Sequence, residues 1–149
     1  ETPRIIDPRN AFIMTSLLKE VINTGTARKA KSLKREDIAG KTGTTNELVD
    51  AWFAGFNPDM VTITWMGFDQ PKSLGKHESG SRAALPIWID YMRPIIGEYP
   101  TKIVETPDGI IPLRINPKNG MLANKDEDSI YEYFYDEFPP SDNAYFLLN

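Results

Sequence analysis

The sequence contains no cysteine and a single histidine, His77, among its 149 residues. Without cysteine the chain has no disulfide, no thiolate metal site and no cysteine nucleophile, and one imidazole is too few for a histidine metal cluster. No apolar run approaches the ~20 residues of a membrane-spanning helix, and the first residues lack the apolar stretch of a signal peptide. The net charge of -4 argues against a nucleic-acid partner. A hydrophobic content of 40%, by contrast, predicts a packed core.

One amphipathic helix is predicted near the N-terminus. Asp7 can cap its first turn and Pro8 suits the first helical position, so the helix begins there. Gly25 is a plausible C-terminal cap, which places the last helical residue near Asn23. Five apolar residues recur at helical spacing and predict one buried stripe: Met14, Leu17, Leu18, Val21 and Ile22. The basic segment 26–37 that follows predicts a solvated loop, because it has no aromatic residue to stack on a base.

Three strands and a second helix are predicted in the middle of the chain. The strands cover residues 38–45, 49–56 and 61–68, and their short connections favour an antiparallel meander. The second helix covers residues 83–96 and has a wide apolar face, so we expect it to lie flat on the sheet. Four of its residues share that face: Ala84, Trp88, Tyr91 and Ile95.

The C-terminal part of the chain has a different composition. Two apolar runs flank Asn119-Gly120, a dipeptide typical of hairpin turns. Acidic and aromatic residues then mix through residues 126–138, which predicts a segment laid over a surface with its rings inward. We therefore place a boundary after residue 123 and treat residues 124–149 as an acidic, aromatic tail.

The most informative short stretch is GKTGTTN, at residues 40–46. It is not a phosphate loop of the G-x-x-x-x-G-K-[ST] type, because the leading glycine would fall at position 35, which is arginine. Taken alone, it is also compatible with an edge strand whose lysine only discourages aggregation. The third hypothesis is the K-T-G element of serine acyl-transfer enzymes that react with penicillins.

Residues 41–45 of this stretch each suit acyl-transfer chemistry. Lys41 would hold an ammonium beside a nucleophilic serine and attract a substrate carboxylate. Thr42 and Thr44 would donate hydroxyl hydrogen bonds to that carboxylate, and Thr45 is assigned to the same substrate-binding set. Gly43 leaves room for a ligand backbone to lie along the strand. The Thr44 N–H would face the developing oxyanion, where one donor contributes about 3–4 kcal/mol of transition-state stabilisation.

A family resemblance rests on four longer stretches: NTGTARKA, AGKTGTTN with DAWFAGFNPDMVTITWMGFD after it, SGSRAALPIWIDYM, and INPKNGMLA. Together they closely resemble the C-terminal half of the transpeptidase domain in class A penicillin-binding proteins, over about residues 8–123. The resemblance implies a mixed α/β (α+β) fold, the C-terminal portion of the penicillin-binding/β-lactamase-like fold, in which helices cover an antiparallel meander. Residues 1–123 are assigned to that domain. Two more strands and a helical subdomain would come from an N-terminal segment outside this chain.

Two further motifs of this family have formal matches here, and both are interpreted as coincidences. S-x-x-K matches the stretch from Ser16 to Lys19, but Ser16 points away from the apolar stripe, in mid-helix, and too few residues separate it from Lys41. S-x-N matches Ser141-Asp142-Asn143, which follows K-T-G where the family order places it before, and Pro139-Pro140 favours a turn there. The chain is therefore expected to supply one wall of a cleft and to lack the nucleophile.

The resemblance implies a serine D,D-transpeptidase that cross-links peptidoglycan stem peptides ending in D-Ala-D-Ala and that β-lactams acylate. Lys41 and Thr44 are the catalytic residues carried over, and no metal or organic cofactor is implied. The N-terminal segment would bring S-x-x-K and S-x-N, and the parent protein would also hold a glycosyltransferase. The implied location is the periplasmic side of the inner membrane, with the anchor outside this chain. The isolated chain is expected to fold poorly and to be inactive.

Three alternatives stay open. The chain could belong to a non-catalytic peptide-binding or β-lactam-binding module, such as a sensor. It could belong to a hydrolase on the same scaffold, a D,D-carboxypeptidase or a β-lactamase. It could also be a self-sufficient enzyme that is acylated at Ser16.

Overall fold

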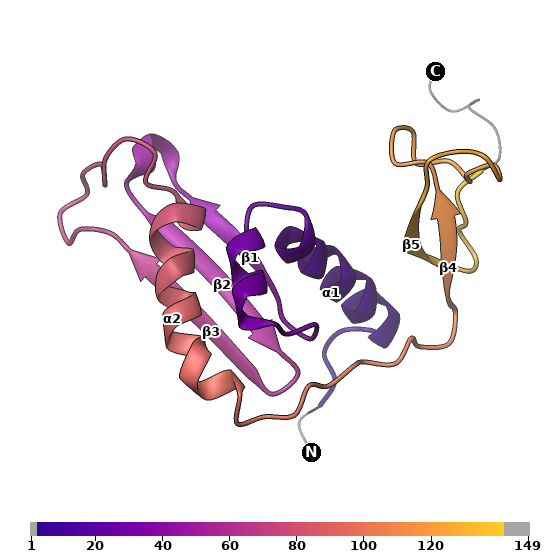
Figure 1. The fold of residues 1–149 in the computed structure, drawn as a ribbon, viewed down its shortest axis with the longest axis horizontal. Helices are drawn as coiled ribbons and strands as arrows, with labels where there is room; N and C mark the ends of the chain where they lie inside the picture. The colour runs from indigo at the N-terminus through magenta and orange to yellow at the C-terminus, as the bar shows by residue number, and fades with distance from the viewer. Residues whose placement is uncertain (1–2, 142–149) are drawn as a thin grey trace. The chain divides into compact units, whose positions relative to one another are not determined.

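The structure is a computed structural model that describes residues 3–141. The chain divides into two compact units, each of which is described by itself (Figure 1). The sheet unit comprises Thr15–Val104, and the hairpin unit comprises Glu1–Met14 together with Glu105–Asn149. The boundary expected after residue 123 falls inside the hairpin unit. No helix within the described residues is long and apolar enough to cross a bilayer.

The first helix, α1 (Pro8–Asn23), has the predicted bounds. The Asp7 carboxylate accepts a hydrogen bond of 2.9 Å from the Arg9 N–H, which caps the first turn. The predicted stripe is buried at its C-terminal end, where Ile22 joins the core. Two stripe residues are exposed instead, so the prediction was wrong for them: Met14 and Leu17. Periodicity shows that a helix has an apolar side, but it does not show which turns of the helix are covered by the rest of the chain.

The basic segment after α1 is helical, and the predicted loop was wrong. Residues Arg28–Leu33 form the short 3₁₀ helix η1. Ala27 and Ala30 are fully buried against the core, while the lysine and arginine side chains of η1 stay exposed. The small alanines therefore order the backbone although the charged groups remain solvated, as the sequence predicted.

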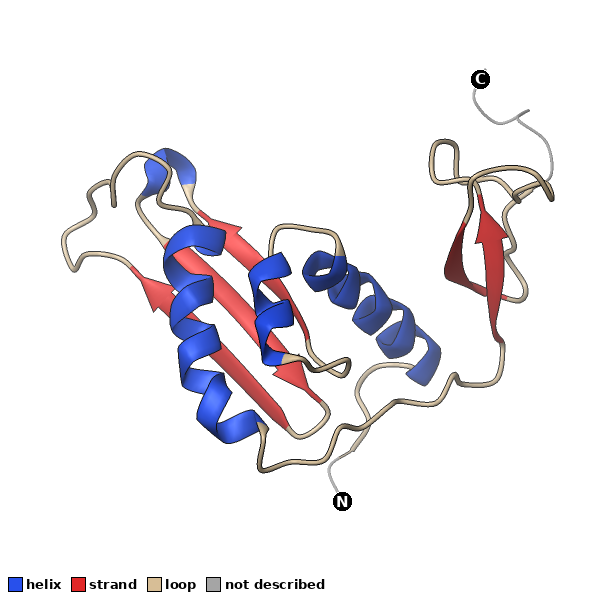
Figure 2. Ribbon diagram, in the orientation of Figure 1, coloured by secondary structure: helices blue, strands red, loops and turns tan. Residues whose placement is uncertain are grey.

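The sheet unit contains the predicted antiparallel meander, and the fold class is confirmed. Its strands are β1 (Ala39–Thr44), β2 (Ala51–Asn57) and β3 (Met60–Met66), in the order β1-β2-β3 (Figure 2). The ends of each strand differ from the predicted ends by at most two residues. In the described part of the chain, β1 and β3 are the two edges of this sheet.

One face of the sheet is covered by α2 (Leu85–Ile96), which follows the π-helical turn η3 (Gly80–Ala84) (Figure 1). Trp88 is fully buried at the centre, where its ring meets the Phe53 ring edge-to-face at 5.1 Å. Tyr91 is exposed although it was expected to face the sheet. The buried face is rotated from the predicted one and consists of Leu85, Trp88, Ile89, Met92 and Ile96. An apolar helix with a wide stripe leaves this rotation undetermined by sequence.

In the hairpin unit, β4 (Ile110–Ile115) pairs antiparallel with β5 (Ile130–Tyr135). The predicted turn at Asn119-Gly120 is present, and the Gly120 N–H donates to Asn116 O at 2.8 Å. After this turn the chain forms only an isolated antiparallel β-bridge, between residues 115 and 122. The long partner of β4 is instead β5, which the sequence had assigned to the tail.

Aromatic side chains of β5 pack within the hairpin unit on the first turns of α1. Tyr133 meets Phe12 edge-to-face at 4.9 Å, and the Arg9 guanidinium lies 5.0 Å from the Tyr135 ring centroid. Arg9 also forms an ion pair of 2.7 Å with Glu137, which lowers the pKa of Glu137 to about 2. Some rings are inward as expected, but two others are exposed: Tyr131 and Phe138. The motif Ser141-Asp142-Asn143 extends beyond the described residues.

Candidate active site at the edge of the sheet

The K-T-G stretch lies on β1, an edge of the described sheet. The Thr45 N–H donates to Asp50 O at 3.1 Å, which continues the register of the β1–β2 ladder. Since hydrogen-bonding groups alternate along an antiparallel strand, the backbone groups of Lys41 and Gly43 face β2. The N–H groups of Thr42 and Thr44 therefore face the open edge. An extended peptide or a developing oxyanion at this edge would meet free donors.

Lys41 lies on the face of the sheet opposite α2. It pairs with Ala54 across the ladder, and Ala54 pairs with Ile63. Phe53, which precedes Ala54 on β2, is buried under α2. Because successive side chains of a strand point to opposite faces, the side chains of Lys41, Ala54 and Ile63 point away from α2. The Lys41 ammonium is exposed and donates to Thr42 O at 3.0 Å.

The hydroxyl groups of Thr42 and Thr44 both have partners in the structure. Thr42 Oγ1 lies 2.8 Å from Thr26 Oγ1, in the segment between α1 and η1. Thr44 Oγ1 accepts a hydrogen bond of 3.0 Å from the Gly80 N–H, at the start of η3. Both hydroxyls are thus oriented by residues outside the strand.

Gly80 is required by the close approach of η3 to the sheet. A Cβ atom at this position would lie 2.4 Å from Trp52 O and 2.5 Å from Gly43 O. Only glycine brings its N–H this near to Thr44. Gly43 is also tight, because a Cβ there would lie 3.2 Å from Trp52 Cβ. Sequence reasoning missed Gly80 and Thr26, although Ser-Gly-Ser ahead of a helix and Thr-Gly-Thr behind one mark unusual backbone.

The Thr45 hydroxyl belongs to the turn after β1. It accepts from the Asp50 N–H at 2.8 Å and donates to Asp50 Oδ2 at 3.4 Å. The other Asp50 oxygen accepts from Trp65 Nε1 at 2.9 Å. Glu47 and Leu48, at the tip of this turn, have left-handed φ angles of 60° and 58°. Among the threonines predicted to bind substrate, Thr45 differs because its hydroxyl both donates to and accepts from Asp50.

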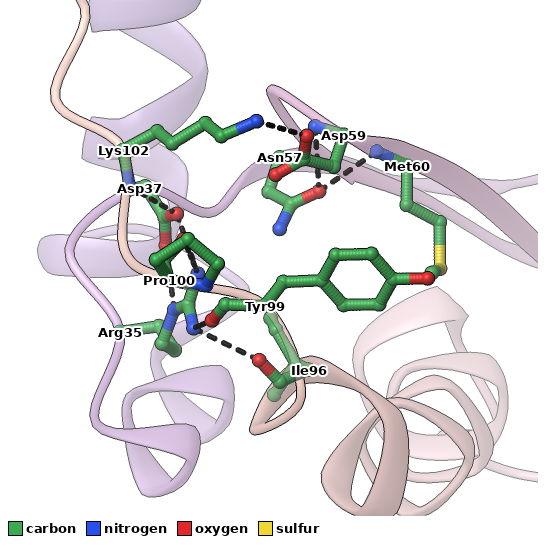
Figure 3. A network of polar contacts seen from close by, with 9 residues as sticks. All are labelled: Arg35, Asp37, Asn57, Asp59, Met60, Ile96, Tyr99, Pro100 and Lys102. Atoms are coloured by element: carbon green, nitrogen blue, oxygen red, sulfur yellow. Dashed lines mark hydrogen bonds and ion pairs between the residues drawn. The ribbon is translucent and has the colours of Figure 1, made fainter.

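A buried ion pair holds the chain just before β1 (Figure 3). Arg35 donates two hydrogen bonds to Asp37, of 2.8 and 2.6 Å, and both side chains are almost fully buried. Arg35 also donates to three backbone carbonyls at the end of α2 and just after it, those of Ile96, Tyr99 and Pro100. The Lys102 N–H donates to Asp37 Oδ2 at 3.0 Å. The Lys102 ammonium in turn pairs with Asp59. The start of β1 is thereby tied to the end of α2.

The charge of Asp37 is maintained despite its burial. Burial alone would raise the pKa of the Asp37 carboxyl, but the hydrogen bonds from Arg35 and from Lys102 N–H outweigh burial. The net result is a pKa below the ordinary value of 3.8. The ion pair is therefore intact at neutral pH.

The other candidates from the sequence lie away from this edge. Ser16 lies in the middle of α1, and no hydrogen bond joins it to Lys41 in the described residues. His77 is exposed in the loop after β3 and has a left-handed φ of 69°. Within residues 3–141, no group of three or more His, Asp or Glu side chains is arranged to hold a metal ion.

The face that Lys41 shares is apolar and open in the described chain. Val61 and Ile63 are 72% and 60% exposed, and Trp52 and Trp65 pack side by side with ring centroids 6.1 Å apart. Large exposed apolar patches on proteins usually mark surfaces that contact other protein. We call this set of four residues the open face.

Comparison with known proteins agrees with this architecture. The chain is 51% identical over 142 residues to penicillin-binding protein 1A of Pseudomonas aeruginosa, a match that covers 94% of the chain and 17% of that protein. It is 53% identical over 109 residues to penicillin-binding protein 1A of Neisseria lactamica, covering 73% of the chain and 14% of that protein. No family model matches the chain.

A solved structure has the same fold. The crystal structure of penicillin-binding protein 1A from Haemophilus influenzae matches 93% of the chain and 22% of its own length, with a TM-score of 0.85 and 35% identity. The chain therefore belongs to the penicillin-binding protein family. The three relatives named above are of the 1A type, and the chain spans less than a quarter of the length of each.

Proposed function

We propose that this chain is the K-T-G part of a serine D,D-transpeptidase that cross-links peptidoglycan stem peptides. The observation that carries the proposal is the row Lys41–Ala54–Ile63, which sets the Lys41 ammonium on the same face as the open apolar patch. Any segment that covers this patch comes to lie beside Lys41. The proposed occupant is the N-terminal segment of the same protein, carrying the serine of S-x-x-K together with S-x-N.

The proposed reaction has two steps. The serine oxygen attacks the carbonyl of the penultimate D-Ala of one stem peptide, an acyl-enzyme ester forms, and the terminal D-Ala leaves as the free amino acid. The amine of a second stem peptide then attacks the ester, which releases the serine and creates the cross-link. β-Lactams enter the same first step, in which the ring amide opens and the acyl group stays on the serine.

Residues 41–45 each have a role in this proposal. Lys41 binds the terminal carboxylate and keeps the field beside the serine positive, which favours loss of its proton. Thr42 and Thr44 donate to the carboxylate. The Thr44 N–H, at the open edge, donates to the oxyanion of the tetrahedral intermediate. Gly43 lets the peptide lie against the strand. The Thr45 hydroxyl would contribute less, because Asp50 engages it.

The larger setting is proposed from the family resemblance. The parent protein would be anchored on the periplasmic side of the inner membrane by a segment outside this chain and would also carry a glycosyltransferase. The proposed chemistry uses a serine ester and needs neither a metal nor an organic cofactor. The isolated chain would be inactive, since its S-x-x-K match at Ser16 is mid-helix in α1 and a second match, at Ser73, lies in the loop after β3.

The test is acylation of the complete penicillin-binding protein by a fluorescent penicillin. We expect Lys41→Ala to lower the acylation rate constant by about 100-fold or more, in line with the loss of a preorganised electrostatic group, without lowering the thermal midpoint. Lys72→Ala, in the exposed loop after β3, is the matched control and should label normally. Normal labelling of Lys41→Ala would rule out the proposed role.

Two alternatives are separated by their products. A carboxypeptidase or β-lactamase would release hydrolysed peptide or drug instead of cross-linked dimers from paired stem peptides. A sensor module would bind but turn nothing over. A penicillin adduct on Ser16, detected by mass spectrometry of tryptic peptides, would show that the nucleophile belongs to this chain.

A further inference from the structure

We propose that the Thr26 hydroxyl donates to Thr42 and thereby directs the Thr42 proton toward the ligand, which makes Thr26 a positioning residue for the substrate carboxylate. This inference rests on the function proposed above for β1. The observation that motivates it is the 2.8 Å contact between the two hydroxyl oxygens, which joins the segment after α1 to the K-T-G strand.

The direction of this hydrogen bond follows from the ligand. A hydroxyl has one proton and two lone pairs, while a carboxylate has lone pairs only. If Thr42 donates to the carboxylate, then its proton is used, and in the bond to Thr26 it must accept. Thr26 must therefore be the donor. The three groups form a chain in which each donation strengthens the next.

Thr44 supplies an independent parallel. Its hydroxyl accepts from the Gly80 N–H at 3.0 Å, a donor that cannot reverse. The Thr44 proton is consequently free to point elsewhere. With Thr26 as donor, Thr42 has the same arrangement, so both threonines of β1 accept from a fixed group and donate outward. Thr26 does for Thr42 what the Gly80 N–H does for Thr44.

The backbone around Thr26 is held firmly enough for this role. The N–H groups of Thr24 and Gly25 donate to Glu20 O at 2.9 and 3.0 Å, and the Ala27 N–H donates to Val21 O at 2.9 Å. Ala27 is fully buried. A Cβ atom at Gly25 would lie 2.8 Å from Val21 Cα, so only glycine allows this close return of the chain. The backbone is therefore held in place on both sides of Thr26, at Gly25 and at Ala27.

The test compares Thr26→Val with wild type in the complete penicillin-binding protein. Valine keeps the shape of threonine and removes the donor. The measurement is the second-order acylation rate constant for benzylpenicillin and for its methyl ester, which lacks the anionic carboxylate. We expect about a 3- to 10-fold loss for the acid, the scale of one oriented hydrogen bond, and no loss for the ester. Thr26→Ser should restore the rate, and Thr26→Ala should lose as much as Thr26→Val.

Further variants separate this inference from the proposed function. Thr42→Val should lower acylation by the acid, and the double variant with Thr26→Val should be no worse, because Thr26 acts through Thr42. Thr101→Val, at another exposed threonine of the sheet unit, should change nothing. A normal rate in Thr26→Val beside a reduced rate in Thr42→Val would overturn the role of Thr26 alone. Equal losses for acid and ester would also overturn it. A normal rate in Thr42→Val would overturn the proposed carboxylate site itself.

Discussion

On β3, the two faces of the sheet differ in a way that the hydrophobic effect alone would not suggest, because threonines face the helical layer and apolar residues face away from it. The face covered by α2 and η3, here called the closed face, carries Thr62 and Thr64 of β3. Trp88 Nε1 donates to Thr62 O at 3.1 Å, and Thr64 Oγ1 donates to Ala84 O at 3.0 Å. The open face carries Val61 and Ile63, exposed in the described chain. The difference teaches that the closed face holds the sheet unit together, while the open face suits contact with other protein.

The largest expected effect comes from the centre of the closed face. Trp88→Ala removes the ring packed on Phe53 and the hydrogen bond that Trp88 Nε1 donates to Thr62 O. We expect a loss of about 3–5 kcal/mol in the free energy of unfolding, as for other large-to-small changes in cores. Urea unfolding of the complete protein, followed by circular dichroism, measures it. A loss below about 1 kcal/mol would mean that the closed face does not carry the stability assigned to it.

The buried ion pair at the approach to β1 should come next. Asp37→Asn leaves the Arg35 guanidinium buried without its counter-charge, and we expect a loss of about 3 kcal/mol, the lower end for breaking a buried pair. The same variant tests the sign of the pH dependence. Because the folded pKa of Asp37 is depressed, its contribution is present above pH 3.8 and is lost as the pH falls through the folded pKa.

The comparison between wild type and Asp37→Asn isolates that contribution. Below pH 3.8 the difference in unfolding free energy between the two proteins should shrink as the pH decreases. A constant difference between pH 7 and pH 2 would contradict the depressed pKa. Glu36→Gln, at the exposed neighbouring acid, should leave the profile of the wild type unchanged.

The smallest expected effect tests the open face. Ile63→Ser removes an apolar side chain that is 60% exposed in the described chain. If the N-terminal segment covers this face in the complete protein, the change should lower the unfolding free energy by about 1–2 kcal/mol. Ile87→Ser, at an exposed position of α2 outside the open face, is the matched control and should cost less than about 0.5 kcal/mol. Equal, negligible costs for both variants would indicate that the open face stays in water.

The order and type of the main elements could be predicted from the sequence because their signals are local. Asp7-Pro8 places the start of α1, and the turns around residues 45–50 and 57–60 separate three strands that pair in sequence order. The K-T-G strand was expected at an edge, where it lies in the described sheet. Residue types, short connections and turn chemistry were sufficient for this much.

The details that depend on tertiary contacts could not be predicted. The rotation of α2, which exposes Tyr91, and the pairing of β4 with β5 both depend on long-range packing. The same holds for the partners of the site: Thr26 and Gly80 come from segments distant in sequence from β1, and nothing local to K-T-G points to them. Chemistry of a short motif can be inferred from its residues, while the groups that orient it appear only once the chain is folded.

The loop between β3 and η3 has one consequence for how the chain tolerates changes of length. Its midpoint is tied to the turn after β1, since the Leu74 N–H donates to Leu48 O at 2.8 Å. Extra residues inserted around Gln70 would bulge into solvent ahead of this tether. Extra residues inserted after Leu74 would instead move the Gly80 N–H away from the Thr44 hydroxyl. An epitope tag or a fluorescent-protein fusion is therefore best accommodated before the tether.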